Sequence, residues 1–186
     1  MTTALGPREL PFSPLRIACE LRGSHPPPLD PPPVSWRAGL DISPLDPSVP
    51  EDARWLHACL WPDQPERHAR LEAAIGVARE HPVKVRRGDA LTDLPGLIAE
   101  APEDALVCVF HTAVLLYFTR EQIGELNARL QAVGRDVAWV AGEAPGILTE
   151  YSPGKPLHFV LSAGRPGALV PRGHMGHHGG WLEWLG

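Results

Sequence analysis

The sequence has little cysteine and no excess of positive charge. Its three cysteines, Cys19, Cys59 and Cys108, are too few and too scattered for a disulfide framework in a chain of 186 residues. We expect them to be small buried thiols in a reducing compartment. The formal net charge is -5, so no basic surface indicates binding to nucleic acid.

Long hydrophobic runs are also missing. No apolar run approaches the roughly 18 residues that a membrane span needs. The N-terminal sequence MTTALGPREL has neither the basic region nor the apolar region of a secretory signal. We therefore expect a cytoplasmic protein that does not associate with a membrane. Hydrophobic residues still make up 44% of the chain, which is enough for a packed core in one domain.

Proline, by contrast, is abundant, with 22 residues. Two triplets, at positions 26–28 and 31–33, predict an extended linker. Residues 1–33 are therefore expected to form a leader, a short strand and this proline-rich strap. Residues 34–186 are expected to form an α/β domain.

The most informative stretch is residues 105–118, ALVCVFHTAVLLYF. Its nearly uninterrupted apolar start predicts a strand buried on both faces, with His111 at its end. Thr119 and Gln122 follow with the spacing of a capping box, which predicts a helix from there to about residue 133. In open α/β sheets, ligands bind at the carboxyl ends of such strands. We therefore expect a ligand pocket around His111.

The remaining pattern alternates strands with helices. Strands are predicted at 15–21, 34–42, 83–87, 136–142, 156–163, 167–170 and 181–185. Capping boxes at Ser48 and Asp63 predict two further helices, and residues 91–100 predict another. A turn at residues 164–166 predicts a hairpin. Strands that alternate with helices and end in a hairpin indicate a doubly wound α/β sheet.

Several phrases occur together in this chain: LRIACELRG, WRAGLDISPLD, RWLHACLWPDQPERHARLEAAI, RRGDAL, VFHTAVLLYF and HGGWLEWL. Together they resemble the C-terminal part of the bacterial domain-of-unknown-function family 2332, over about residues 13–186. This resemblance implies a mostly parallel, Rossmann-like sheet similar to that of class I S-adenosylmethionine (SAM)-dependent methyltransferases, followed by an antiparallel C-terminal hairpin.

The resemblance gives four polar residues a role. Asp41, at the end of the second predicted strand, would bind the ribose of SAM, and Asp89 would lie near the adenine. His111 would act as a general base, with Glu143 as its partner acid in the catalytic site. Each residue also has a structural interpretation: Asp41 and Asp89 as turn residues, His111 as a satisfied strand-end histidine, and Glu143 as a cap.

Members of the family carry an earlier Glu-Ile-Gly-x-Ser-x-Gly-like phrase, which resembles the methyltransferase glycine-rich loop. Residues 1–33 do not reproduce it. The chain is therefore expected to be the C-terminal half of the family's domain, without the first glycine-loop βα unit. This predicts a methyltransferase-like domain for a small molecule that is incomplete alone and pairs with an N-terminal chain or another copy. The alternative is a non-catalytic remnant or an interaction module that pairs through an exposed sheet edge.

Three histidines near the C-terminus, His174, His177 and His178, have a His-x-x-His-His spacing that could hold a metal ion. No acid or cysteine of comparable spacing accompanies them, and glycines surround them. We therefore expect a solvated loop here and no metal site.

Overall fold

The computed structural model describes residues 15–28, 30, 32–151 and 158–186. The predicted leader, two positions of the strap, and the start of the strand predicted at 156–163 lie outside these residues. The chain divides into two compact units. We call the described parts of Cys19–Trp36 and Ala90–Gly186 the sheet unit. We call those of Pro7–Ala18 and Arg37–Asp89 the helical unit.

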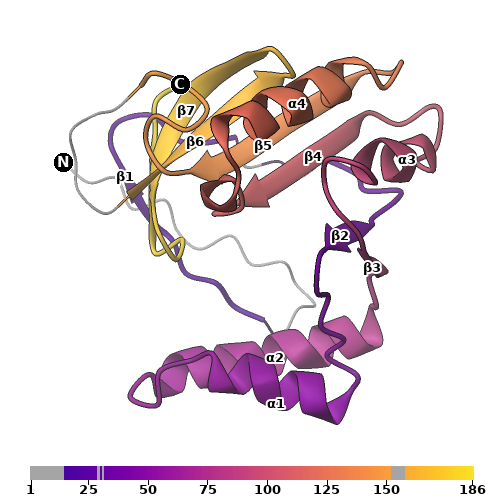
Figure 1. Ribbon diagram of the computed structural model, residues 1–186. Helices are drawn as coiled ribbons and strands as arrows, with labels where there is room; N and C mark the ends of the chain where they lie inside the picture. The colour runs from indigo at the N-terminus through magenta and orange to yellow at the C-terminus, as the bar shows by residue number, and fades with distance from the viewer. Residues whose placement is uncertain (1–14, 29, 31, 152–157) are drawn as a thin grey trace. The chain divides into compact units, whose positions relative to one another are not determined.

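The sheet unit contains a six-stranded sheet with the order β1-β8-β7-β6-β5-β4 (Figure 1). The strands are β1 (Glu20–Arg22), β4 (Val107–Thr112), β5 (Val137–Glu143), β6 (His158–Arg165), β7 (Ala168–Gly176) and β8 (Trp181–Trp184). Three further elements complete the unit: helix α3 (Leu94–Ala99), the 3-10 turn η1 (Leu115–Tyr117) and helix α4 (Arg120–Gln131).

The fold is mixed α/β, but the six-stranded sheet is mostly antiparallel. β4 pairs with β5, and β1 with β8, in parallel, whereas β5–β6, β6–β7 and β7–β8 are antiparallel. The expected antiparallel hairpin is confirmed as β6–β7, with Gly167 in its turn at a φ of 84°. A mostly parallel, doubly wound sheet is not confirmed. The physical reason is that β6, β7 and β8 each pair antiparallel with the strand before it, an arrangement that needs no helical crossover.

Strand β4 is buried on one face only, so the prediction of burial on both faces is wrong. Burial alternates along the strand: Val107 is buried, whereas Cys108 and Phe110 are exposed, and 79% of the Phe110 surface is accessible. Such alternation is expected of an edge strand that has a core on one side. The expectation of buried thiols is also wrong, because all three cysteines are free and exposed.

The core of the sheet unit lies on the other face of β4 and β5. Leu126 and Leu130 of α4 pack there with Val137 and Trp139 of β5, and Leu115 of η1 joins the same cluster. Figure 1 shows α4 running alongside this part of the sheet. The capping box predicted at Thr119 is confirmed: the Gln122 N–H donates to the Thr119 hydroxyl at 3.3 Å, and the Gln122 side chain accepts from the Thr119 N–H at 2.8 Å.

Arg135 fixes the segment that leads into β4. Its guanidinium donates to the carbonyl oxygens of Ala101 at 2.9 Å, Pro102 at 2.6 Å and Ala105 at 2.7 Å. A fourth, longer hydrogen bond goes to the Ile98 carbonyl oxygen at 3.5 Å. These acceptors for one planar cation hold the chain between α3 and β4 in one conformation. The start of β4 is therefore anchored, and the position of its carboxyl end follows from the parallel pairing with β5.

The helical unit contains α1 (Pro50–Ala58), α2 (Pro65–Glu80) and a parallel pair of short strands, β2 (Gly39–Asp41) and β3 (Val85–Arg87). The capping boxes predicted at Ser48 and Asp63 are not formed. Val49 and Gln64 occupy the N-cap positions and make no side-chain cap, because a proline takes the first helical position in each case. Ser48 instead donates to the Asp46 carboxylate from its backbone N–H and its hydroxyl, and these hydrogen bonds lower the pKa of Asp46.

None of the helices in the described part of the chain is long and apolar enough to cross a membrane.

Candidate functional site

The parallel pair β4–β5 brings two predicted site residues together. His111 of β4 lies opposite Ala141 of β5, and Glu143 ends β5 two residues further on. Residues two apart on a strand point to the same face, so His111, Ala141 and Glu143 share the face that carries the core. The side chains of His111 and Glu143 are 12% and 2% exposed, respectively. A buried acid and an imidazole thus meet at the carboxyl ends of two parallel strands.

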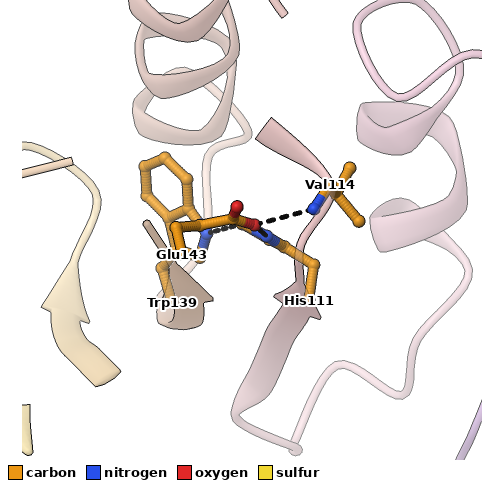
Figure 2. Close-up of polar contacts among 4 residues, drawn as sticks. All are labelled: His111, Val114, Trp139 and Glu143. Carbon is orange, nitrogen blue, oxygen red and sulfur yellow. Dashed lines mark hydrogen bonds and ion pairs between the residues drawn. The ribbon is translucent and has the colours of Figure 1, made fainter. Parts of the chain in front are cut away.

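Figure 2 shows that the Trp139 indole, the Glu143 carboxylate and the Val114 backbone N–H converge near the His111 ring. His111 Nδ1 lies 2.7 Å from Glu143 Oε1. The same carboxylate oxygen accepts the Val114 backbone N–H at 3.0 Å. On the other side of the ring, the Trp139 indole N–H donates to His111 Nε2 at 2.9 Å. Glu143 therefore holds both the imidazole and the start of the turn that follows β4.

These contacts fix the tautomer of the imidazole. An indole N–H can only donate, so Nε2 must be the nitrogen with the lone pair. Nδ1 then carries the hydrogen and donates it to Glu143. A carboxylate on Nδ1–H is the arrangement that orients a histidine for proton transfer at Nε2. Here that lone pair is already used by Trp139, which is only 1% exposed.

The turn after His111 is strained. Ala113 has a φ of 55°, and it is the one residue other than glycine in the described chain with a positive φ. The Ala113 N–H donates to the Gly142 carbonyl oxygen at 3.0 Å, and the Val114 N–H donates to Glu143. These two hydrogen bonds offset the cost of a left-handed conformation for alanine. Strained backbone next to a buried acid–histidine pair is a common feature of functional sites.

The two acids expected to bind SAM lie in the helical unit. Asp41 ends β2 and is exposed, and its Oδ1 accepts the Ser43 N–H at 2.7 Å. Its backbone carbonyl oxygen accepts the Gly88 N–H at 2.9 Å, which brings the ends of β2 and β3 together. Asp89 follows Gly88 and is also exposed. A single site that contains these acids together with His111 and Glu143 stays a prediction.

The C-terminal histidines are not all in a loop. His174 lies within β7 and is 2% exposed, so for this residue the expectation of a solvated loop is wrong. The reason is that β7 extends to Gly176, six residues beyond the predicted strand, and pairs with both β6 and β8. His177 and His178 are exposed in the following turn, as expected. In the described part of the chain, no group of three or more His, Cys, Asp or Glu side chains is arranged to hold a metal ion.

Sequence reasoning missed Trp139, although a signal was present. Trp139, Ala141 and Glu143 alternate along one strand and therefore share a face, so an indole donor near the acid could have been inferred. It also missed His158, which is 2% exposed and lies at the start of β6. His158 follows a Pro- and Gly-rich stretch, which carries no pattern that would mark the histidine as buried.

The fold and the site define a mixed α/β protein with a buried glutamate–histidine pair at the ends of parallel strands. A family model described as "Uncharacterized protein conserved in bacteria (DUF2332)" matches residues 2–184, and the chain belongs to this family. No curated protein and no solved structure matches the chain.

The Trp139–His111 hydrogen bond generates a prediction about the reactivity of the imidazole. Trp139→Phe removes the indole N–H and leaves the Nε2 lone pair without its donor. We expect His111 to react with diethylpyrocarbonate several times faster in this variant than in the parent chain, as measured by mass spectrometry of the modified peptide. His81, which is exposed, supplies the internal control. Equal rates at His111 in the two proteins would contradict the hydrogen bond.

Proposed function

We propose that the chain is a SAM-dependent methyltransferase-like domain that acts on a small molecule in the cytoplasm and requires an additional N-terminal half. The observation that carries the proposal is the His111–Glu143 pair, with Nδ1 and Oε1 2.7 Å apart at the carboxyl ends of β4 and β5. Ligands bind at this end of parallel strands in open α/β sheets. SAM, when bound, would supply the methyl group.

His111 would be the general base. Glu143 keeps the hydrogen on Nδ1, so a proton from the substrate would pass to Nε2. The substrate must first replace the Trp139 N–H, because one lone pair cannot serve both groups. Proton transfer is therefore coupled to a change in one buried hydrogen bond, and the resting imidazole is held in an unreactive state.

The acids of the helical unit fit the cofactor in part. One oxygen of Asp41 accepts the Ser43 N–H, and the second is available for the ribose hydroxyls. Asp89 is exposed and would accept the amine of the adenine. In the described residues before β2, the one strand is β1, which pairs with β8, and no helix follows it. A glycine-rich floor for SAM would come from an N-terminal partner chain.

The first test is calorimetric titration of SAM into the chain, with and without a candidate N-terminal half. We expect binding with the added half, and a loss of about 10- to 100-fold in affinity for Asp41→Ala, since a hydrogen bond to a charged group is removed. Asp63→Ala, which removes another exposed acid of the helical unit, should bind as the parent does. An unchanged affinity for Asp41→Ala would remove this residue from the cofactor site.

The second test concerns the base. His111→Ala in the assembled protein should lower methyl transfer by roughly 10²- to 10⁴-fold, the usual contribution of a general base. SAM affinity and the circular dichroism spectrum should stay the same. Methyl transfer at the parent rate would rule out the role of His111.

One observation favours a second function, that of an interaction module. Strand β4 is at the edge of the six-stranded sheet and has no charged residue and no proline. Leu106 and Phe110, before and within the strand, are 68% and 79% exposed. Unprotected apolar edges of this kind pair with other strands.

If β4 pairs with another copy of the chain, Phe110→Lys should shift the protein toward the monomer, because lysine on an edge strand opposes pairing. Sedimentation velocity over a range of concentrations would measure the shift. Val170→Lys places the same charge on β7, inside the sheet, and should leave the association unchanged. A parent chain that is monomeric at all concentrations would exclude this mode of pairing between copies.

A further inference from the structure

A second group of polar and aromatic side chains lies near Glu143. The strand register places Glu143 opposite Val160, Val160 opposite His174, and His174 opposite Glu183. Residues paired across neighbouring strands point to the same face. Glu143, His174 and Glu183 therefore share the core face of the sheet. His158 lies two residues before Val160, on this face and at the same end of the sheet.

Two buried groups in this region have unused hydrogen-bonding capacity within the described part of the chain. Glu143 Oε2 is buried and has no hydrogen-bond partner there, although Oε1 has two. Both ring nitrogens of His158 are also buried, and neither has a hydrogen-bond partner there. Buried polar atoms without partners are costly and rare in folded proteins. The two side chains come from diagonal positions on neighbouring strands, so their backbones are about 7–8 Å apart.

Aromatic rings surround His158. The His174 ring centroid lies 5.3 Å from that of His158, and the Trp181 centroid lies at 6.5 Å. Tyr151 Oη is 2.9 Å from His174 Nε2. Gly176, opposite His158 on β7, has no Cβ, and a Cβ there would come within 2.8 Å of the Trp181 indole nitrogen. The glycine thus leaves the space in which the indole lies beside His158.

We propose that Glu143 and His158 bind the ammonium group of one small primary amine between them. The free oxygen of Glu143 can only accept, and an ammonium group is the strongest donor for it. A neutral imidazole has one acceptor and one donor nitrogen on opposite sides of its ring. The acceptor nitrogen of His158 would take a second ammonium hydrogen.

The charges and rings of the region support a cationic ligand. Glu143 and Glu183 place two carboxylates on this face, and Glu183 Oε2 lies 3.7 Å from His174 Nδ1. The face of Tyr151 adds a favourable interaction with a cation. One face of Trp181 already carries a cation, the Arg22 guanidinium, 4.6 Å from the ring centroid. A ligand with a carboxylate or a phosphate would be repelled. The inference rests on the proposed function only for the fate of the ligand, which would be the methyl acceptor; binding itself does not involve SAM.

The test is a titration of the full chain with ethanolamine, without SAM, monitored by NMR of ¹⁵N-labelled histidine side chains. We expect saturable shifts of the His158 ring signals. Ethylene glycol lacks the ammonium group, and acetate has the wrong charge, so neither should cause a saturable shift at the same concentrations. Glu143→Gln and His158→Phe should each weaken ethanolamine binding by about tenfold or more, with the shifts of His174 as the readout for the second variant.

Matched controls are Glu103→Gln and His81→Phe, which change exposed residues and should bind as the parent does. Absence of a saturable shift in the parent chain would overturn the proposal and would mean that an ordered water satisfies these atoms. An equal response to ethylene glycol would overturn it too. The three titrations of the parent chain decide the question even if a variant does not fold. Ethanolamine binding by a chain that binds no SAM even with the added N-terminal half would refute the proposed function and leave this site standing.

Discussion

The Glu143 carboxylate holds together the part of the molecule on which the site depends. Its Oε1 accepts hydrogen bonds from a side chain at the end of β4 and from a backbone N–H just beyond it. Because Glu143 is itself the last residue of β5, one buried oxygen joins the ends of two strands to the turn η1. The left-handed Ala113 lies inside this small network, so the strained backbone is held from both sides.

A buried carboxylate needs hydrogen-bond donors for its oxygens, and this requirement explains the contacts around Glu143. His111 and Val114 satisfy one oxygen, and Trp139 in turn satisfies the far side of the imidazole. The second oxygen is buried without a hydrogen-bond partner in the described residues, and its chemistry is that of an acceptor. One oxygen of this carboxylate, Oε1, therefore has a structural role, and the other, Oε2, is the atom that we propose binds a ligand. Proton transfer and ligand binding would be linked through one side chain.

The sequence predicted the elements better than it predicted their surroundings. The Thr119 capping box was found because it depends on residues three apart, whereas the caps at Ser48 and Asp63 failed because prolines at positions 50 and 65 moved the helix starts by one residue. The apolar run of β4 suggested burial on both faces, but burial depends on which strand lies at the edge of the sheet. That order comes from long-range pairing, which local patterns do not contain.

The candidate site could be predicted in part for the same reason. Glu143 was considered as the partner of His111 because both residues end neighbouring strands, and this is a matter of sequence order. The hydrogen bond from Trp139 depends on the register between β4 and β5, which the sequence does not contain. The burial of His158 and His174 depends on the antiparallel pairing of β6 with β7, and β7 is longer than the strand that the sequence predicted. Asp41 and Asp89 were read from turn positions, and their exposed carboxylates are equally suited to a turn and to a ligand.

Gly142, the residue before Glu143, lies on the face of the sheet opposite to this carboxylate. Its missing side chain allows Thr112 of β4 and Met175 of β7 to pack against the backbone, since a Cβ at this position would lie 3.0 Å from Thr112 Cγ2 and 3.1 Å from Met175 Sδ. The outward side of the sheet is thereby covered at the end of β5. The Glu143 carboxylate lies on the opposite face, which also carries His158. A ligand of this carboxylate would therefore be separated by the sheet from Thr112 and Met175.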